Sequence, residues 1–296
     1  MIKRYGLRRS DSRLAIILLA PAFIYLALLL FFPLLWGIVF SFSNKVIGAE
    51  AVFTGLSNFK NLITNINFLN SVKATCLYTV FAIFFKTLFG IIMALLLNME
   101  FRGRSFVRAL LLIPWTLPNL VAVLNWKWIF ANQGGALNGL LSALGLIDEN
   151  IIWLATAGSA FICIIIVNVW RGVPFFGITI LSKLQTIPLE LYEAASIDGA
   201  SRIQKFFNIT MPSIRDITLL SALVSTIWTI NDFESIWLLT GGGPNGKTAV
   251  ITVFSYTTAI QSMQIGKALA VSVLAMPILI LLITQVTRLS TRSNTQ

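Results

Sequence analysis

Residues 241–248 carry residue types and spacing that match a phosphate-binding motif. The stretch LTGGGPNGKT contains Gly241, Gly246, Lys247 and Thr248 in the order G-x-x-x-x-G-K-[ST], and the preceding SIWLL could form a buried strand. A loop of this kind binds nucleotide phosphates only above a parallel sheet and with a second acidic motif for magnesium, which together require a soluble domain. Nucleotide binding by this chain therefore depends on whether the sequence has room for such a domain.

Composition instead predicts a protein embedded in lipid. Of 296 residues, 57% are hydrophobic and only 11% are charged, and the mean hydropathy is +0.85. Histidine is absent, which removes the commonest general base and metal ligand, so we expect neither a catalytic triad nor a metal site. Cys76 and Cys163 lie in apolar runs, where packing is the favoured interpretation.

Six stretches are apolar and long enough, at roughly 20 residues, to cross a bilayer as helices. They run over residues 14–44, 74–99, 106–130, 157–181, 217–239 and 268–287. The expected fold is therefore an all-α membrane protein with six transmembrane helices. A transmembrane domain is expected over residues 14–288, preceded in the sequence by a terminal segment of residues 1–13 and followed by one of residues 289–296.

The Lys and Arg residues predict the orientation of these spans, because cytoplasmic loops retain positive charge. With both termini in the cytoplasm, most of the 22 basic residues lie inside: Lys3, Arg4, Arg8, Arg9, Arg13, Arg102, Arg104, Arg108, Lys183, Arg202, Lys205, Arg215, Arg288 and Arg292. Lys86 and Arg171 fall within spans. This distribution explains the net charge of +11 without nucleic acid as a partner. It also puts residues 241–248 on the outer face, where a tight reversal at a helix end is favoured over a nucleotide site.

The longest cytoplasmic segment joins the fourth and fifth spans over residues 182–214. It is predicted to form two short helices: Pro188 starts the first, Gly199 interrupts the pattern, Ser201 caps the second, and Pro212 ends it. From composition alone, this segment could be an ordinary connector with its charges in water, or a surface that another protein approaches over the small residues Ala194, Ala195 and Gly199.

The string EAASIDGASRIQKFFNITMP resembles the EAA loop of the membrane-spanning permeases of bacterial ABC importers. The resemblance extends over almost the whole chain in order, including LLIPWTLPNLVAVLNWKWIF and DFESIWLLTGGGP, and is greatest to the carbohydrate-type branch for maltose, multiple sugars and glycerol phosphate. It implies a type I importer fold in the prokaryotic inner membrane. By this resemblance, Glu193, Ala194, Ala195, Asp198 and Gly199 form a coupling helix that sits in a cleft of an ATPase subunit.

The resemblance also implies how the work is divided among subunits. A second homologous permease would complete the path, and a heterodimer is implied more than a homodimer. Two cytoplasmic ATPase subunits would bind ATP and magnesium, and an extracytoplasmic binding protein would deliver the solute. This chain would then be a transport subunit with no cofactor of its own.

Polar residues inside spans are the candidates for the solute path, because they are costly against lipid. Ser221, Ser225, Trp228, Thr229, Asp232 and Ser235 recur at helical spacing. Trp228, Asn231 and Asp232, with Asn168 and Trp170 on the fourth span, suit sugar hydroxyls and sugar C–H faces. Contact with the partner permease is an equally open role. For Arg171 a structural or interface role is favoured over solute contact, and Lys127 is interpreted as a snorkelling anchor.

Two other classes of function fit less well. A transporter driven by an ion gradient would use the polar residues as an ion site, but the two halves show no internal repeat, and the EAA-type loop would have no purpose. A membrane enzyme is disfavoured by the missing histidine and by the lack of clustered carboxylates at a cytoplasmic helix end.

Overall fold

A computed structural model describes residues 9–293, which fold mostly into helices, with two short strands. Five are long and apolar enough to cross a membrane: Ile16–Ser41, Ile66–Asn98, Ala157–Leu184, Arg202–Ile230 and Ile265–Ser290. A sixth span is available if the bent pair Arg104–Thr116 and Asn119–Ile129 is counted as one. The predicted all-α membrane fold is confirmed. Lys3, Arg4 and Arg8, used above for the orientation, lie outside the described residues.

The chain divides into two compact units, which are described separately. The first comprises residues up to 62 together with 257–274. Its elements are α1 (Arg9–Leu26), a π-helical turn (Ala27–Phe31), α2 (Phe32–Ser41), β1 (Ser43–Asn44), β2 (Val52–Phe53), α3 (Ser57–Thr64), a second π turn (Thr257–Gln261) and the start of α14 (Ile265–Ser293). Strands β1 and β2 pair antiparallel. The buried Asn58 side chain donates to the carbonyls of Ser41 and Ser43, both at 2.9 Å, and so fixes the end of α2.

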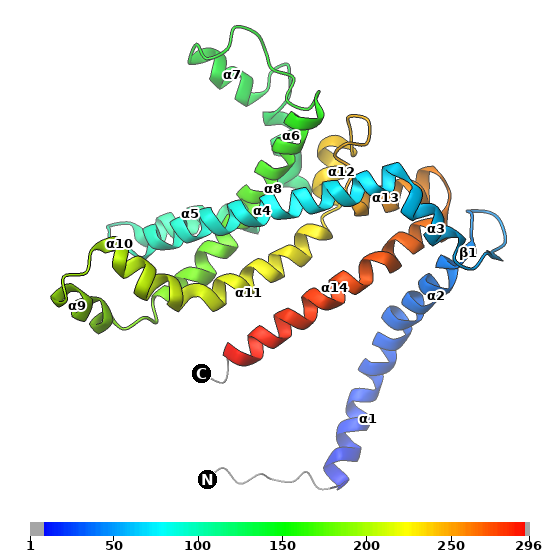
Figure 1. The fold of residues 1–296 in the computed structure, drawn as a ribbon, viewed down its shortest axis with the longest axis horizontal. Coiled ribbons are helices and arrows are strands. Elements are labelled where there is room, and N and C mark those ends of the chain that lie inside the picture. Colours follow the sequence, from blue (N-terminus) through cyan, green and yellow to red (C-terminus); the bar gives the residue numbers. More distant parts are fainter. Residues whose placement is uncertain (1–8, 294–296) are drawn as a thin grey trace. The chain divides into compact units, whose positions relative to one another are not determined.

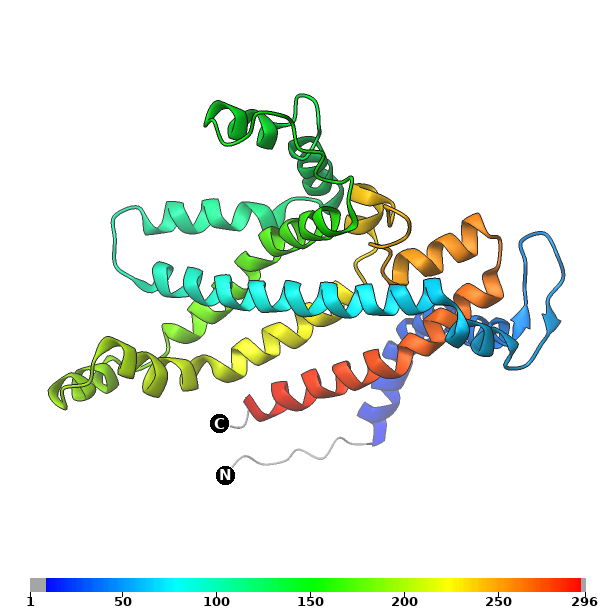
Figure 2. The ribbon, with the colours of Figure 1, turned by 45° about the horizontal axis from the view of Figure 1, so that its top comes forward.

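The second unit comprises residues 63–256 and the chain from 275 on. Its elements are α4 (Ile66–Asn98), α5 (Arg104–Thr116), α6 (Asn119–Ile129), α7 (Ala136–Ala143), α8 (Ala157–Leu184), α9 (Leu189–Ile197), α10 (Arg202–Lys205), a π turn (Phe206–Thr210), α11 (Met211–Ile230), α12 (Glu234–Thr240), α13 (Ile251–Tyr256) and the rest of α14. Helix α4 packs along α8, and α11 packs against both (Figures 1 and 2).

Glycines allow α4 and α8 to approach closely. A Cβ atom added at Gly90 would lie 2.3 Å from the Cβ of Phe176, and one at Gly177 would lie 2.6 Å from the Met93 sulfur. Small residues serve this purpose in membrane helices, where packing rather than exclusion of water holds helices together. The buried side chains form two clusters along these helices, one around Tyr78, Ile164 and Val167 and the other around Leu97, Phe176 and Ile180.

Two predicted spans are interrupted. Leu117 precedes Pro118 and is extended (φ −67°, ψ 137°), as a residue before proline prefers, and the chain bends by 94° between α5 and α6. The predicted span over 217–239 was wrong in its continuity, since α11 ends at Ile230 and α12 begins at Glu234. At this break Asn231 donates from its side chain to the Ile227 carbonyl, and Asp232 accepts from the Ser235 backbone, so side-chain bonds replace part of the helical ladder.

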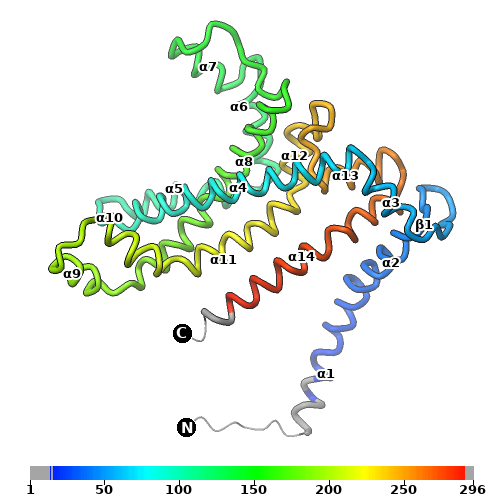
Figure 3. Tube along the Cα trace, viewed as in Figure 1, coloured from blue at the N-terminus to red at the C-terminus, as the bar shows by residue number. Residues whose placement is uncertain are grey.

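The segment between α8 and α11 can be followed in Figure 3. As predicted, α9 begins after Pro188 and ends before Gly199, and Ser201 caps α10, with its Oγ accepting from the Gln204 N–H and Gln204 Oε1 accepting from the Ser201 N–H. The expectation that Pro212 ends this helix was wrong. Pro212 is the second residue of α11 and follows directly on the π turn Phe206–Thr210, and the helix runs unbroken over Arg202–Ile230.

Candidate functional site

A polar cavity of about 250 Å³ lies where α4, α8 and α11 meet the bend between α5 and α6. Its lining combines cationic, anionic, amide, hydroxyl and aromatic side chains: Lys86, Trp115, Asn119, Asn168, Arg171, Gly172, Phe175, Ser225, Trp228, Thr229 and Asp232. A cavity with these groups can hold a polar solute that also has an apolar face.

Lys86 is the most buried cation of the cavity. Its side chain is 4% exposed, and its Nζ atom donates to Ser225 Oγ at 3.2 Å and to Thr229 Oγ1 at 3.1 Å. The neighbouring helix makes room for it, because a Cβ atom at Gly172 would lie 2.5 Å from Lys86 Cε. Burial and hydrogen bonding together fix the lysine ammonium group against α11.

The Asp232 carboxylate is the anionic group of the cavity, and three other elements hold it. Its Oδ2 atom accepts from the Tyr78 hydroxyl at 2.7 Å and from Asn168 Nδ2 at 3.0 Å. Its Oδ1 atom accepts from the Ser235 backbone N–H at 3.1 Å, at the start of α12. The Asp232 carboxylate therefore connects the break between α11 and α12 to both α4 and α8.

Aromatic rings form one wall of the cavity. Phe175 lies between two indoles, with its centroid 5.0 Å from that of Trp228 and 6.4 Å from that of Trp115. Trp115 is 50% exposed and Trp228 is 52% exposed. Such rings offer flat faces for the C–H surface of a ring-shaped polar solute.

The structure brings together some of the predicted path residues and separates others. Asn168, Trp228 and Asp232 line the polar cavity. Asn231 is exposed and bonds to its own helix, and Trp170 lies on the far face of α8, with its indole 5.6 Å from that of Trp126. Arg171 lines the polar cavity rather than an outer surface.

Sequence reasoning missed Lys86, Trp115 and Asn119. The signal for Lys86 was available, because it is the single charged residue of the predicted span over residues 74–99, and such a residue is expected to face a protein interior or a watery path. Nothing in the local pattern marks Trp115 or Asn119, which reach the cavity because the chain bends between them. Lys127 is also more than an anchor, since its Nζ atom donates to the Leu238 carbonyl of α12 at 2.9 Å.

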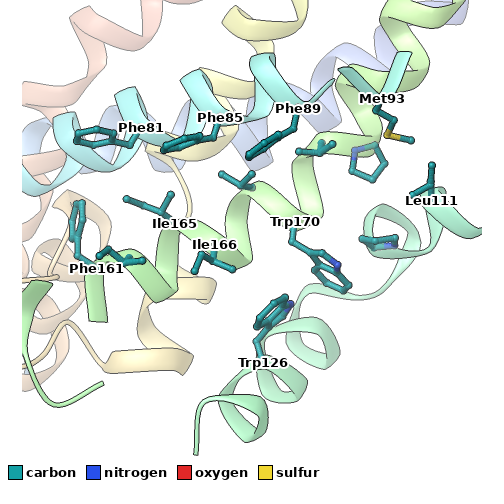
Figure 4. Close-up of a pocket in the computed structure, with 15 residues that line it drawn as sticks. Phe81, Phe85, Phe89, Met93, Leu111, Trp126, Phe161, Ile165, Ile166 and Trp170 are labelled. Atoms are coloured by element: carbon teal, nitrogen blue, oxygen red, sulfur yellow. The ribbon is translucent and has the colours of Figure 1, made fainter. Parts of the chain in front are cut away.

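A larger cavity of about 740 Å³ lies on the opposite face of α8, and Figure 4 shows its side chains. Phe81, Phe85 and Phe89 of α4 face Ile165, Ile166 and Trp170 of α8 across it, with Trp126 of α6 and Leu111 of α5 nearby. Its only side-chain polar groups are two indole N–H groups. A solute with many hydroxyls would lose its hydrogen bonds there, so the smaller polar cavity is the better candidate despite its size.

Helix α9 presents the predicted coupling residues to solvent. Glu193, Ala194, Asp198 and Gly199 are exposed, and Ala195 is half-buried. The helix ends in a Schellman cap: the Ala200 N–H donates to the Ala195 carbonyl and the Gly199 N–H to the Ser196 carbonyl, with Gly199 at φ +76°. The pair Tyr192 OH and Thr210 Oγ1, 2.9 Å apart, ties α9 to the π turn before α11.

The stretch from Gly241 to Thr248 is a reversal at a helix end. Helix α12 precedes it, in place of the strand a phosphate loop requires, and Gly241 and Gly242 have φ of +62° and +85°. The Thr248 hydroxyl is buried and donates to the Gly243 carbonyl at 2.6 Å, whereas Lys247 is exposed. Within residues 9–293 the sheet consists of two short antiparallel strands. The tight reversal was therefore the better interpretation.

Comparison with known proteins agrees with this architecture. Residues 86–294 match the family described as "Binding-protein-dependent transport system inner membrane component". The trehalose/maltose transport system permease protein MalF of Thermococcus litoralis is 32% identical over 84% of this chain and 84% of its own length. The sulfoquinovosyl glycerol transport system permease protein SmoG of Agrobacterium fabrum is 33% identical over 89% of this chain and 86% of its own.

A solved structure shares the fold over nearly the whole length. It belongs to a bacterial alginate ABC transporter in complex with an alginate pentasaccharide-bound periplasmic protein, and it gives a TM-score of 0.81 at 22% identity, covering 96% of each chain.

Proposed function

Because the chain belongs to the family of binding-protein-dependent transport system inner membrane components, we propose that it is the permease subunit of an ABC importer whose solute is a sugar or glycoside. The observation that carries this proposal is the polar cavity with an aromatic wall between α4, α8 and α11. The names of the two relatives support the same solute class.

In this proposal the polar cavity is half of the solute path. Asn119, Ser225 and Thr229 provide groups that can exchange hydrogen bonds with sugar hydroxyls, and Trp228 provides a face for the ring. Trp115 and Trp228 are each about half exposed on the isolated chain. A second, homologous permease would cover this side and complete the path, and a heterodimer is the arrangement we favour.

Helix α9 is the surface through which a cytoplasmic ATPase would act on this subunit. Glu193, Ala194 and Asp198 are exposed, and within residues 9–293 the Glu193 carboxylate has no protein partner. The caps at Gly199 and Ser201 hold α9 and α10 as one rigid elbow joined to α11. ATP and magnesium would be bound by the ATPase subunits, and an extracytoplasmic binding protein would deliver the sugar to the opposite face, with both termini of this chain in the cytoplasm.

Uptake by the assembled importer tests the proposal. The chain is reconstituted into proteoliposomes with its partner permease, its ATPase subunits and the binding protein, and a panel of labelled neutral and acidic sugars is offered with and without ATP. We expect ATP-dependent uptake of at least one sugar. Trp228→Ala should lower that uptake about tenfold, corresponding to about 1.4 kcal/mol.

Trp128 provides a matched control, because it is 59% exposed on α6 and does not line the polar cavity. Trp128→Ala should leave uptake near the unmodified level. Uptake that continues without ATP, or that is the same for Trp228→Ala and the parent protein, would contradict the proposal.

A further inference from the structure

The polar cavity contains more positive than negative charge. Two cationic side chains, Lys86 and Arg171, line it together with one carboxylate, Asp232. A second carboxylate, that of Glu234, is exposed and does not line the cavity, and Asn119 Nδ2 donates to it at 2.7 Å. An excess charge in a membrane interior is costly unless a group of opposite sign neutralises it.

The hydrogen-bond pattern shows which groups are still available. Asp232 already accepts from Tyr78, Asn168 and Ser235. Lys86 donates to two hydroxyls and so retains one of the three N–H bonds of an ammonium group. Among residues 9–293, the buried Nε–H of Arg171 has no hydrogen-bond partner, and neither has the buried Oδ1 of Asn168. The cavity thus offers two charged donors and one acceptor that no group in the described part of the chain uses.

We infer that the cavity takes a sugar ring bearing one negative charge, such as a carboxylate or a sulfonate, and that Lys86 and Arg171 are the residues that select for it. This inference rests on the proposed function and narrows its substrate class. The guanidinium group suits an oxyanion because it can donate two parallel hydrogen bonds. Asn168 Oδ1 accepts from a ring hydroxyl, and Trp228 stacks on the ring. The volume of about 250 Å³ lies below the roughly 300 Å³ of the smallest typical ligand pockets, so it fits one ring of a longer solute.

Binding of three sugars that differ only in charge tests this selectivity. The whole importer is placed in nanodiscs, and the affinities for methyl glucuronide (anionic), methyl glucoside (neutral) and methyl glucosaminide (cationic) are measured by ligand-observed NMR. We expect the glucuronide to bind about tenfold more tightly than the glucoside, as one charge-assisted hydrogen bond would provide. The glucosaminide should bind most weakly of the three.

Substitutions assign the preference to the cavity. Lys86→Gln and Arg171→Gln should each reduce the ratio of glucuronide to glucoside affinity toward one, whereas Lys86→Arg, which retains the charge, should preserve most of it. Lys127→Gln is the matched control: its ammonium group bonds to the Leu238 carbonyl outside the cavity, so the ratio should stay at the unmodified value.

The outcomes separate the inference from the proposed function. Equal affinity for glucuronide and glucoside, or a ratio that Lys86→Gln and Arg171→Gln leave unchanged, overturns the charge selectivity while sugar transport stands. Acetate that displaces the glucuronide at equal concentration would overturn it too, by identifying a site for any small anion. Failure of all three sugars to bind would overturn the proposed sugar path itself.

Discussion

The Tyr78 hydroxyl donates a 2.7 Å hydrogen bond to the Asp232 carboxylate, joining residues 154 positions apart in the chain. Tyr78 is 1% exposed in the middle of α4, and Asp232 sits in the break between α11 and α12. With Asn168 of α8 on the same oxygen, this bond connects three helices at the edge of the polar cavity. The shape of the cavity on this side therefore depends on one hydroxyl.

Tyr78→Phe removes that hydroxyl and keeps the ring. A buried hydrogen bond to a charged group contributes about 1.5–3 kcal/mol, so we expect a clear fall in the thermal unfolding temperature of the importer in detergent. Tyr256→Phe is the control, since the Tyr256 ring packs on Phe233 and Trp237 and its hydroxyl makes no hydrogen bond to any residue of the described range 9–293. Equal unfolding temperatures for the two variants would show that the Asp232 bond is not needed to hold the helices.

Gly90→Ala tests the close approach of α4 and α8. The added methyl group would lie 2.3 Å from the Phe176 Cβ atom, which cannot move without its backbone, so the helices must separate. Overpacking of this kind costs about 1–3 kcal/mol, and we expect a lower yield of folded protein by size-exclusion chromatography. Gly158→Ala in the first turn of α8, where nothing lies within 4 Å of the added Cβ, should match the parent. A normal yield for Gly90→Ala would contradict the packing described here.

Gly199→Ala tests the elbow between α9 and α10. A Cβ atom at φ +76° costs about 1–2 kcal/mol although nothing lies within 4 Å of it, so the strain is confined to the turn. We expect less ATPase subunit to co-purify and weaker stimulation of ATP hydrolysis by sugar, with the membrane helices intact. Gly139→Ala on the exposed surface of α7 should change neither measurement. Unaltered co-purification and stimulation for Gly199→Ala would remove α9 from the coupling surface.

The sequence was sufficient to predict the spans because lipid imposes a simple requirement on them. Long runs that are mostly apolar become helices, since a helix is the simplest structure that satisfies their backbone within a membrane. The caps at Gly199 and Ser201 were also predictable, because each cap depends only on residues a few positions away in the sequence. The break after Ile230 was not, because the helical spacing of polar residues continues across it from Thr229 to Asp232 and Ser235. The cost of leaving the helix is met by contacts of Asp232 with α4 and α8.

The candidate site was predictable only in part, because it depends on how each helix is rotated against its neighbours. Asn168 and Trp170 are two positions apart on α8, so their side chains point about 200° apart around the helix. Arg171 follows Trp170 directly and faces the polar cavity, while Trp170 faces the apolar one. Polar residues indicate which span carries the site. The sequence of a single helix does not predict which of its faces the neighbouring helices will cover.

The unbroken helix from Arg202 to Ile230 connects the elbow between α9 and α10 at one end with the polar cavity near the other end. At 1.5 Å per residue, the distance along the axis from Arg202 to Thr229 is about 40 Å. A tilt of only about 5° about one end would then swing the other end by about 3.5 Å, which is more than the length of either hydrogen bond from Lys86 to α11. A small displacement at the elbow between α9 and α10 is thus large enough to break the hydrogen bonds of Lys86 to α11 and change the outline of the cavity.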